Sequence, residues 1–476
     1  MGADRRDGTL RRVELVETDE LETDDAAVAS TPLAPGAAPR EARTGRTRRR
    51  TVTVLVCVAA LAVTFVVSSL WQGWSDRTAL LGSTGGVSSL ATPPAARWTV
   101  TATGPDAWAV GEALVVLHDD GLAAFSPRDG AALWTVGLGA GARCGTTDTD
   151  AAPRASGLVC LTGAGNDPVA VAVGEDGTVS SRTALGSDLG QATVVPGGVL
   201  RWHRAGGALS VAVQDAGDGS VLWRSTVAPD DVAVEGLCRP QVSGTAAATV
   251  EHGLVVVRGC RVSAVFAPDG SRLDDPDEPV TVQVLPAGDG RFLRTTTASS
   301  SGAVEVTQLV ASDGTVERIV PGRPLVPLAT DGTADPTRLL SVPSGVQALD
   351  PSGTERWTLS GTVSRVLVVA AGTAVLDLGY VVQGVDLASG RVTWSFARES
   401  LGTVDTVAGA FTDGDVATLA LSTLDDDGPG RLVTLDLDDG DVLWDEPYAG
   451  DPTGLRALGG HLVHVDPVAG RMVVLG

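Results

Sequence analysis

The sequence predicts an all-β fold built from repeated units, preceded by a disordered arm and one transmembrane helix. Three features lead to this prediction: a turn pattern that recurs along most of the chain, a composition rich in glycine but with only 4% aromatic residues, and one uncharged apolar run near the N-terminus. The 476 residues include 59 glycines, no lysine and a single isoleucine. Such a composition, with its enrichment in Ala, Val, Gly and Asp, is typical of a high-GC bacterial genome.

The first 50 residues carry few large apolar side chains, so we expect residues 1–50 to form a disordered arm. An acidic stretch at 11–25 is followed by six arginines between positions 40 and 50. The run TVTVLVCVAALAVTFVVSSLW (51–71) then has no charged residue, and as a helix it would extend about 31 Å, enough to cross a bilayer. Because arginines precede this run, the positive-inside rule places the arm in the cytoplasm and the chain after residue 75 outside.

An uncleaved anchor explains the apolar run better than a cleaved secretory signal or a lipoprotein signal. A secretory signal has a short basic start and a small-residue cleavage site, whereas about 50 residues precede this run and Trp71 and Trp74 follow it. A lipoprotein signal has its apolar run before the modified cysteine, but Cys57 has the run behind it. Residues 72–96, including GSTGGVSSLATPPAA (82–96), are then expected to form a flexible linker.

The remaining residues, 97–476, repeat one pattern: an Asp, a Gly four residues later, and a Trp four residues after the Gly. Looser copies occur at 126–134 and 349–357. Marker glycines follow one another at roughly 37 to 51 residues, which is the period of a β-propeller blade and exceeds that of leucine-rich or ankyrin repeats. The complete copies are Asp215/Gly219/Trp223, Asp386/Gly390/Trp394 and Asp436/Gly440/Trp444.

Each copy lies between two runs of alternating β-branched residues, so its glycine is expected in a hairpin turn. Glycine takes a positive φ there without steric cost, and the Asp oxygens accept backbone N–H groups of the turn. The Trp on the following strand is large enough to fill the gap to the next sheet. The acidic run DLDDGDVLW (436–444) is therefore interpreted as a blade turn. As an EF-hand loop with Gly440 as its glycine, it would need a first ligand at Leu435.

The copy GVDLASGRVTW (384–394) resembles the repeat A-x-D-x-x-T-G-x-x-x-W of the quinoprotein-like propeller family, with Gly384 for the Ala and Ser389 for the Thr. The resemblance covers nearly all of 98–476 and implies about eight four-stranded blades. Eight marker glycines lie between positions 130 and 440. Quinoprotein dehydrogenases of this family hold pyrroloquinoline quinone under a disulfide of adjacent cysteines and bind calcium through Glu, Asn and Asp. This sequence has no adjacent cysteines and one asparagine, Asn166, so we expect no cofactor.

The sequence gives equally little support for other catalytic or metal-binding sites. His461 and His464 are three residues apart on an expected strand, which places them on opposite faces rather than around one metal. We find no G-x-S-x-G elbow, P-loop or paired zinc cysteines. A net charge of −23 without a basic face on the exterior domain argues against nucleic acid as a partner. We therefore expect no catalytic, cofactor-binding or metal-binding residues.

Four cysteines follow the apolar run and form two local pairs. In an oxidising exterior we predict the disulfides Cys144–Cys160 and Cys238–Cys260 over the two other pairings, because the members of each pair lie close in the sequence around a turn-rich stretch.

The two ends of the domain are predicted to share one blade. The final run RMVVLG (471–476) stops in strand-like sequence without an outer Trp-bearing strand, and RWTVTA (97–102) resembles the missing strand. Joining them would leave no open sheet edge.

These features favour a non-catalytic, membrane-anchored scaffold that binds a protein or ligand in the cell envelope. Propellers present loops at two flat ends for such contacts. The alternative is a transmembrane sensor or tethering subunit whose segment RRVELVE (11–17) docks a cytosolic protein. A dehydrogenase dependent on pyrroloquinoline quinone is a further alternative.

Overall fold

The structure is a computed structural model that describes the chain from residue 75 to residue 476 with short gaps. The arm at 1–50, the apolar run at 51–71 and the predicted pair Cys238–Cys260 lie outside the described residues. Within the described part, we find no helix that is both long and apolar enough to cross a membrane. The gaps are residues 105, 147–153, 164–167, 187–189, 206–207, 229–246, 252, 260–261, 275–280, 289–290, 298–304, 333–337, 351, 398–405 and 423–429.

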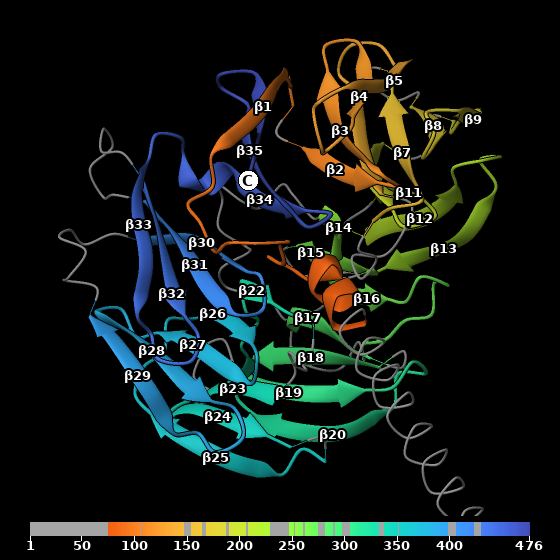
Figure 1. Ribbon diagram of the computed structural model, residues 1–476. Helices are drawn as coiled ribbons and strands as arrows, with labels where there is room; N and C mark the ends of the chain where they lie inside the picture. The colour runs from red at the N-terminus through yellow and green to blue at the C-terminus, as the bar shows by residue number, and fades with distance from the viewer. Residues whose placement is uncertain are drawn as a thin grey trace, which may run out of the picture. The chain divides into compact units, whose positions relative to one another are not determined.

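The described residues form an all-β propeller of nine sheets, which we number as blades 1 to 9 (Figure 1). Within each blade, strands that follow one another in the sequence lie side by side and pair antiparallel. Blade 1 contains β2 (Ala107–Val110), β3 (Ala113–His118), β4 (Gly121–Phe125) and β5 (Ala132–Gly137); blade 2 contains β6 (Arg143–Thr146), β7 (Gly157–Thr162), β8 (Val169–Gly174) and β9 (Val179–Ala184); blade 3 contains β10 (Gln191–Val195), β11 (Gly198–Ala205), β12 (Ala208–Asp215) and β13 (Val221–Val227).

The middle blades follow the same order, with two irregularities. Blade 4 has three strands within the described residues, and blade 7 has a short fifth strand, β22, paired in parallel with β26. Blade 4 contains β14 (Ala247–Glu251), β15 (Leu254–Gly259) and β16 (Val262–Phe266); blade 5 contains β17 (Thr281–Gly288), β18 (Arg291–Thr297), β19 (Glu305–Val310) and β20 (Val316–Pro321); blade 6 contains β21 (Arg323–Pro324), β23 (Leu339–Val342), β24 (Gly345–Leu349) and β25 (Glu355–Ser360); blade 7 contains β22 (Ala329–Thr330), β26 (Arg365–Ala370), β27 (Thr373–Asp377), β28 (Val381–Asp386) and β29 (Val392–Ala397).

The last blade joins the two ends of the propeller, as the sequence predicted. Strand β1 pairs antiparallel with β36, with Val100 opposite Met472, and the Gly476 N–H donates to the Ala95 carbonyl at 2.9 Å. Blade 8 contains β30 (Thr406–Thr412), β31 (Val416–Ser422), β32 (Gly430–Asp436) and β33 (Val442–Tyr448); blade 9 contains β34 (Leu455–Leu458), β35 (His461–Asp466), β36 (Arg471–Leu475) and β1 (Ala96–Thr101).

The count of nine sheets corrects the expectation of about eight blades. Seven of the eight marker glycines lie in turns between the third and fourth strands of blades 1 to 3 and 5 to 8, and Gly270 follows the third strand of blade 4. Blade 9 has no such turn, because its third strand is the C-terminal β36 and its fourth strand is the N-terminal β1. Counting turns therefore misses the blade in which the chain ends meet.

The turn after the third strand has the same backbone construction in each complete copy of the pattern. In blade 8, Gly440 has φ +76°, and its N–H donates to the Asp436 carbonyl at 3.1 Å. The Asp436 carboxylate accepts the Asp438 N–H at 2.8 Å. Trp394 of blade 7 packs on this turn, and its Nε1–H donates to the Leu437 carbonyl at 2.9 Å. The turn of blade 8 thus receives the indole of the preceding blade.

The turn at Gly219 in blade 3 differs from the turn at Gly440, because no tryptophan of the preceding blade packs on it. Gly219 has φ +76° and donates its N–H to the Asp215 carbonyl at 3.0 Å, as predicted. However, a Cβ on Gly219 would lie 2.8 Å from the Thr183 Cγ2 of blade 2, and no indole lies within 4 Å. Blade 2 carries Ser181 where the pattern has its tryptophan, and the Ser181 hydroxyl donates to the Ala216 carbonyl at 3.1 Å. Smaller side chains therefore pack on this turn.

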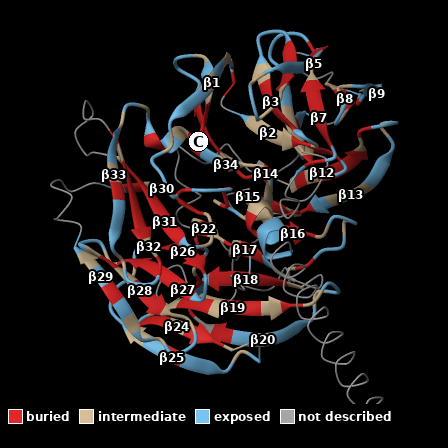
Figure 2. Ribbon diagram, in the orientation of Figure 1, coloured by how far each residue is buried: buried red, intermediate tan, exposed pale blue. Residues whose placement is uncertain are grey.

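The core lies between neighbouring sheets, where buried side chains of one blade meet those of the next (Figure 2). The largest cluster joins blades 7 and 8 around Leu367, Trp394 and Leu435. Burying such apolar surface stabilises the fold by roughly 25 cal/mol per Å². Consecutive blades are therefore held by side-chain packing as well as by the chain connections.

Two buried arginines, which no sequence motif marks, also link blades. Arg201 is fully buried on β11 and donates to the Leu185 carbonyl, just after the last strand of blade 2, at 2.8 Å. Arg294 on β18 donates to the Leu273 carbonyl, next to blade 4, at 3.0 Å and to Gln308 Oε1 at 2.9 Å. Carbonyl and amide oxygens thus accept hydrogen bonds from these buried guanidinium groups.

Candidate functional site

Residues 83–90 cross the ends of three blades, and we call this segment the strap. The Thr84 carbonyl accepts the Thr330 N–H of β22 at 2.8 Å, and the Val87 N–H donates to the Thr412 carbonyl of blade 8 at 2.9 Å. The Ser88 N–H donates to the Gly460 carbonyl of blade 9 at 2.8 Å. The strap therefore differs from the flexible linker expected over 72–96.

Close backbone approach explains the glycines that made the strap look flexible. A Cβ on Gly85 would lie 2.4 Å from the Ala329 Cβ, and Gly85 has φ +71°. A Cβ on Gly86 would lie 1.8 Å from the Leu80 carbonyl oxygen. Only glycine fits at such positions. Glycine in this segment thus permits tight packing against another part of the chain.

Blade 9 has no turn between its third and fourth strands on which Trp444 of blade 8 could pack, and the strap provides this packing partner instead. The Trp444 Nε1–H would otherwise meet a turn of blade 9, but it donates to the Leu90 carbonyl at 2.8 Å. The Leu90 N–H donates to Asp413 Oδ2 at 2.7 Å. Val87 and Leu90 are each 1% exposed and pack with Trp444 and Phe411. The strap takes the place of the turn that is absent where the chain ends meet.

A short helix at residues 75–82 precedes the strap and covers the same end of the propeller. Leu80 is buried, and Leu81 lies so close to Gly460 that a Cβ there would be 2.5 Å from the Leu81 Cδ2. Gly332 faces Ala79 in the same way. The chain therefore meets the propeller through a packed helix followed by a hydrogen-bonded strap.

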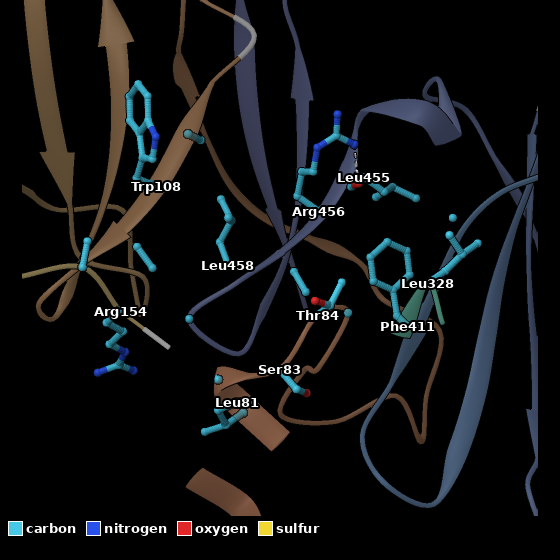
Figure 3. Close-up of a pocket in the computed structure, with 18 of the residues that line it drawn as sticks. Leu81, Ser83, Thr84, Trp108, Arg154, Leu328, Phe411, Leu455, Arg456 and Leu458 are labelled. Atoms are coloured by element: carbon cyan, nitrogen blue, oxygen red, sulfur yellow. Dashed lines mark hydrogen bonds between the residues drawn. The ribbon is translucent and has the colours of Figure 1, made fainter. Parts of the chain in front are cut away.

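A cavity of about 410 Å³ opens between the strap and the first strands of blades 1, 8 and 9 (Figure 3). Trp108 of β2 and Phe411 of β30 approach it from opposite sides, with Leu458 of β34 between them. Ser83 and Thr84 of the strap form another wall. The cavity thus combines an apolar lining with hydroxyl groups, and part of its wall is the strap.

The charged side chains that line this cavity within the described residues are Arg154 and Arg456. Arg154 Nη1 lies 2.6 Å from Oε1 of the exposed Glu112. Arg456 Nη1 donates to the carbonyls of Thr453 at 2.6 Å and Leu455 at 2.8 Å. Guanidinium and hydroxyl donors with an aromatic wall are suited to bind hydrogen-bond acceptors and anions.

The two histidines of β35 lie near this region but do not converge. His464 is 3% exposed and stacks edge-on against Tyr448, with ring centroids 5.5 Å apart. Burial lowers the pKa of His464 and raises that of Tyr448. Burial, assisted by Arg154, also lowers the pKa of His461. Over the described parts of the chain, no group of three or more His, Cys, Asp or Glu residues could hold a metal ion.

The residues of the predicted repeat pattern lie away from this cavity. Asp215, Asp386 and Asp436 sit in the outer turns, where the Ser389 hydroxyl and N–H lower the pKa of Asp386. Trp223 donates to the Pro268 carbonyl of the next blade at 2.9 Å. These residues build blades, and the cavity is lined by different ones.

The structure contains the disulfide Cys144–Cys160, with an S–S distance of 2.03 Å. The two cysteines stand directly opposite each other on β6 and β7. The bond therefore crosses the first two strands of blade 2. The second predicted pair, Cys238–Cys260, lies outside the described residues and stays a prediction.

Comparison with known proteins gives one family. The family model of the outer membrane protein assembly factor BamB matches residues 118–279 and 328–475, more than half of the chain. Among curated proteins, no sequence matches.

Several solved structures are similar at low sequence identity. BamB from Moraxella catarrhalis is 10% identical with a TM-score of 0.40, over 80% of this chain and 99% of that one. The quinohemoprotein alcohol dehydrogenase from Comamonas testosteroni is 12% identical with a TM-score of 0.35, over 80% and 76%. Apo AztD from Citrobacter koseri is 12% identical with a TM-score of 0.33, over 70% and 93%.

Proposed function

The chain belongs to the family of the outer membrane protein assembly factor BamB, and from this premise we propose that it is a membrane-anchored, extracytoplasmic scaffold of the cell envelope. In this proposal, residues 51–71 span the cell membrane, the arm at 1–50 lies in the cytoplasm, and the propeller binds a protein or ligand outside without catalysing a reaction. The membership supports a propeller that serves as a platform, and the uncharged run supports the anchor.

One observation carries the proposal: the segment that follows the apolar run is part of the propeller. The helix at 75–82 and the strap are packed and hydrogen bonded to blades 7, 8 and 9. In this proposal, the propeller is joined to its anchor through a packed segment rather than through a long loose chain. A packed connection of this kind suits a scaffold that must present a surface to a partner.

Protease accessibility tests the proposed topology. Protease added to spheroplasts of cells making the full chain with a tag at each end should digest the propeller and leave a fragment that contains residues 1–50. Permeabilised cells provide the control, because the arm should then be digested as well. Protection of the C-terminal tag in intact spheroplasts would contradict the topology.

A second candidate function is a transmembrane sensor or tethering subunit that acts through its cytoplasmic arm. The specific observation in its favour is that the strap forms a wall of the 410 Å³ cavity. An occupant would therefore touch the segment that leads to the anchor. Purification from membranes with and without residues 1–50 separates the two functions. A scaffold keeps its partner after the arm is removed, whereas a sensor or tether loses a cytosolic one.

A third test addresses the enzyme alternative. We expect the purified full chain, incubated with pyrroloquinoline quinone and calcium, to show no quinone absorbance after desalting and no dye-linked oxidation of alcohols or sugars. A stoichiometric bound quinone with turnover would replace the scaffold by a dehydrogenase.

A further inference from the structure

A second cavity, also of about 410 Å³, opens where blades 5, 6 and 7 meet, and we call it the arginine cavity. Its lining includes Arg323 at the start of β21 and Arg365 at the start of β26, the first strands of blades 6 and 7. The strap instead binds Thr412, at the end of the first strand of blade 8. The arginine cavity therefore lies toward the end of the propeller opposite to the strap.

The arginine cavity exists because the first strand of blade 6 is short. Strand β21 ends at Pro324, and the Leu325 N–H still donates to the Leu339 carbonyl of blade 6 at 2.8 Å. Three residues later, the Leu328 N–H donates to the Val366 carbonyl of blade 7 at 3.1 Å. The chain thus crosses from one blade to the next, and residues of both blades line the space beside the crossing.

Neutral oxygens hold the two guanidinium groups in place. Arg323 Nε donates to Gln283 Oε1 at 3.1 Å, and Arg365 Nη1 donates to the Val407 carbonyl at 2.9 Å. Within the described part of the chain, no carboxylate forms an ion pair with either arginine. The chain carries 58 acidic residues, yet none of the described residues that line this cavity is acidic. Both guanidinium groups therefore keep their charge and further N–H donors for a ligand.

The rest of the lining combines hydroxyl groups with aliphatic side chains. The hydroxyl groups belong to Ser341 and Ser364, and the aliphatic wall includes Leu325, Val326 and Val363. Guanidinium groups bind carboxylate and phosphate oxygens through paired hydrogen bonds. An apolar wall beside a few polar groups is typical of sites for small organic molecules. The lining therefore suits an organic anion better than a bare inorganic ion.

We propose that the arginine cavity binds a small organic acid, with its carboxylate or phosphate group on Arg323 and Arg365 and its apolar part against Val326. The inference rests on the binding role proposed above for the scaffold, and it names a ligand class for that role. Cavities for small molecules measure about 300–1,000 Å³, so this one holds a ligand with a short carbon chain.

Saturation-transfer NMR on ligands mixed with the purified full chain tests this assignment. The probes are 3-methylbutanoate and 3-methylbutyl phosphate, and 3-methylbutanamide is the uncharged counterpart. At least one of the two anions should bind about tenfold more tightly than the amide, because hydrogen bonds between charged groups are the stronger ones. The anion that binds more tightly identifies carboxylate or phosphate as the preferred group.

Substitutions in the cavity should weaken binding of that anion. Arg323→Gln and Arg365→Gln should each do so by about tenfold, since each removes a charged donor. The matched control is Arg391→Gln, which makes the same charge change in the exposed outer turn of blade 7 and should leave the affinity unchanged. Circular dichroism checks the fold of each variant. Arg323→Gln carries the test if loss of the contact with Val407 unfolds Arg365→Gln.

Several results would overturn the inference. They are no binding of either anion, binding of the amide as tight as that of the anions, and equal effects of the cavity variants and Arg391→Gln. Inorganic phosphate that binds as tightly as its ester would overturn the organic ligand class. These results leave the scaffold standing, because its protease and co-purification tests do not involve this cavity. Binding of the anions by a chain that fails the protease test would overturn the topology alone.

Discussion

The packing of Trp394 on Gly440 can be tested by adding one methyl group to either of two glycines with the same backbone conformation. Gly440 and Gly372 both have φ +76°. A Cβ on Gly440 would lie 2.6 Å from Cδ2 of Trp394, whereas a Cβ on Gly372 would meet nothing within 4 Å. Gly440→Ala and Gly372→Ala therefore share the backbone cost and differ in the contact with the indole.

The magnitudes follow from these contacts. A left-handed conformation costs an alanine about 1 kcal/mol, so Gly372→Ala should destabilise the protein by about that amount. Gly440→Ala also has to displace the indole, which adds about 1 kcal/mol for the hydrogen bond to the Leu437 carbonyl. Strain and lost packing add about 1 kcal/mol more. We expect a total of about 3 kcal/mol for Gly440→Ala.

Equilibrium urea unfolding, followed by circular dichroism, measures both variants against the unmodified chain. A double-mutant cycle supplies the control: in a Trp394→Ala background, Gly440→Ala should cost only the backbone contribution, because the indole is gone. Equal shifts of the unfolding midpoint for Gly372→Ala and Gly440→Ala would refute the contact argument. So would an unchanged cost of Gly440→Ala in the Trp394→Ala background.

Three further predictions concern closure, the disulfide and pH. Deleting residues 471–476 removes β36, the partner of β1, so thermal unfolding of the whole propeller should shift to lower temperature; an unchanged transition would contradict closure. The Cys144–Cys160 bond spans 16 residues and should contribute about 3 kcal/mol, so reduction should lower the urea midpoint, and free thiols at both sites in non-reducing peptide mapping would disprove the pairing. Burial lowers the pKa of His464 below its ordinary value, so its stabilising contribution is fully present above about pH 6.5 and is lost as the pH falls through the folded-state pKa. His464→Gln should flatten this part of the stability profile, and an identical slope in the variant would rule out His464 as its cause.

Much of the architecture follows from short-range chemistry and was therefore predictable. The turns at Gly390 and Gly440 depend on residues within a few positions, as does the Asp that accepts their N–H groups. The pairing of Cys144 with Cys160 follows from their close spacing in the sequence, which places them on two consecutive strands of one blade. Closure by β1 was also predictable, because no outer strand follows the last strand in the sequence and residues 97–102 resemble the missing one.

The side chain that packs on a turn comes from a more distant part of the sequence than the residues that form the turn. The copies at Gly219 and Gly440 look alike in sequence and share one backbone conformation. Gly440 nevertheless meets the indole of Trp394, whereas Gly219 meets Thr183. The contact is set by the last strand of the preceding blade, about 40 residues earlier in the sequence, so the turn's own pattern does not reveal it.

The strap and the cavity depend on contacts between distant parts of the chain. Gly85 and Gly86 are compatible with a loose linker and with tight packing, and only the neighbours Ala329 and Thr412 decide between the two. The cavity likewise gathers residues from the beginning, the middle and the end of the domain. No periodic signal marks them, because each first strand of blades 1, 8 and 9 contributes only a short stretch of three or four residues.

The sequence by itself determined the repeated blade turn, the tryptophan on the strand that follows it, the joining of the chain ends and the expectation of an anchor, because each depends on local patterns of glycine, charge and apolar residues. The tertiary structure decided that there are nine blades, since the ninth turn is replaced by the meeting of Gly476 with Ala95. It also decided that residues 83–90 are a strap, since their hydrogen-bond partners lie in blades 7 to 9, hundreds of residues later in the sequence. Contacts of that range leave no mark in a local pattern, because glycine serves equally for freedom and for close approach.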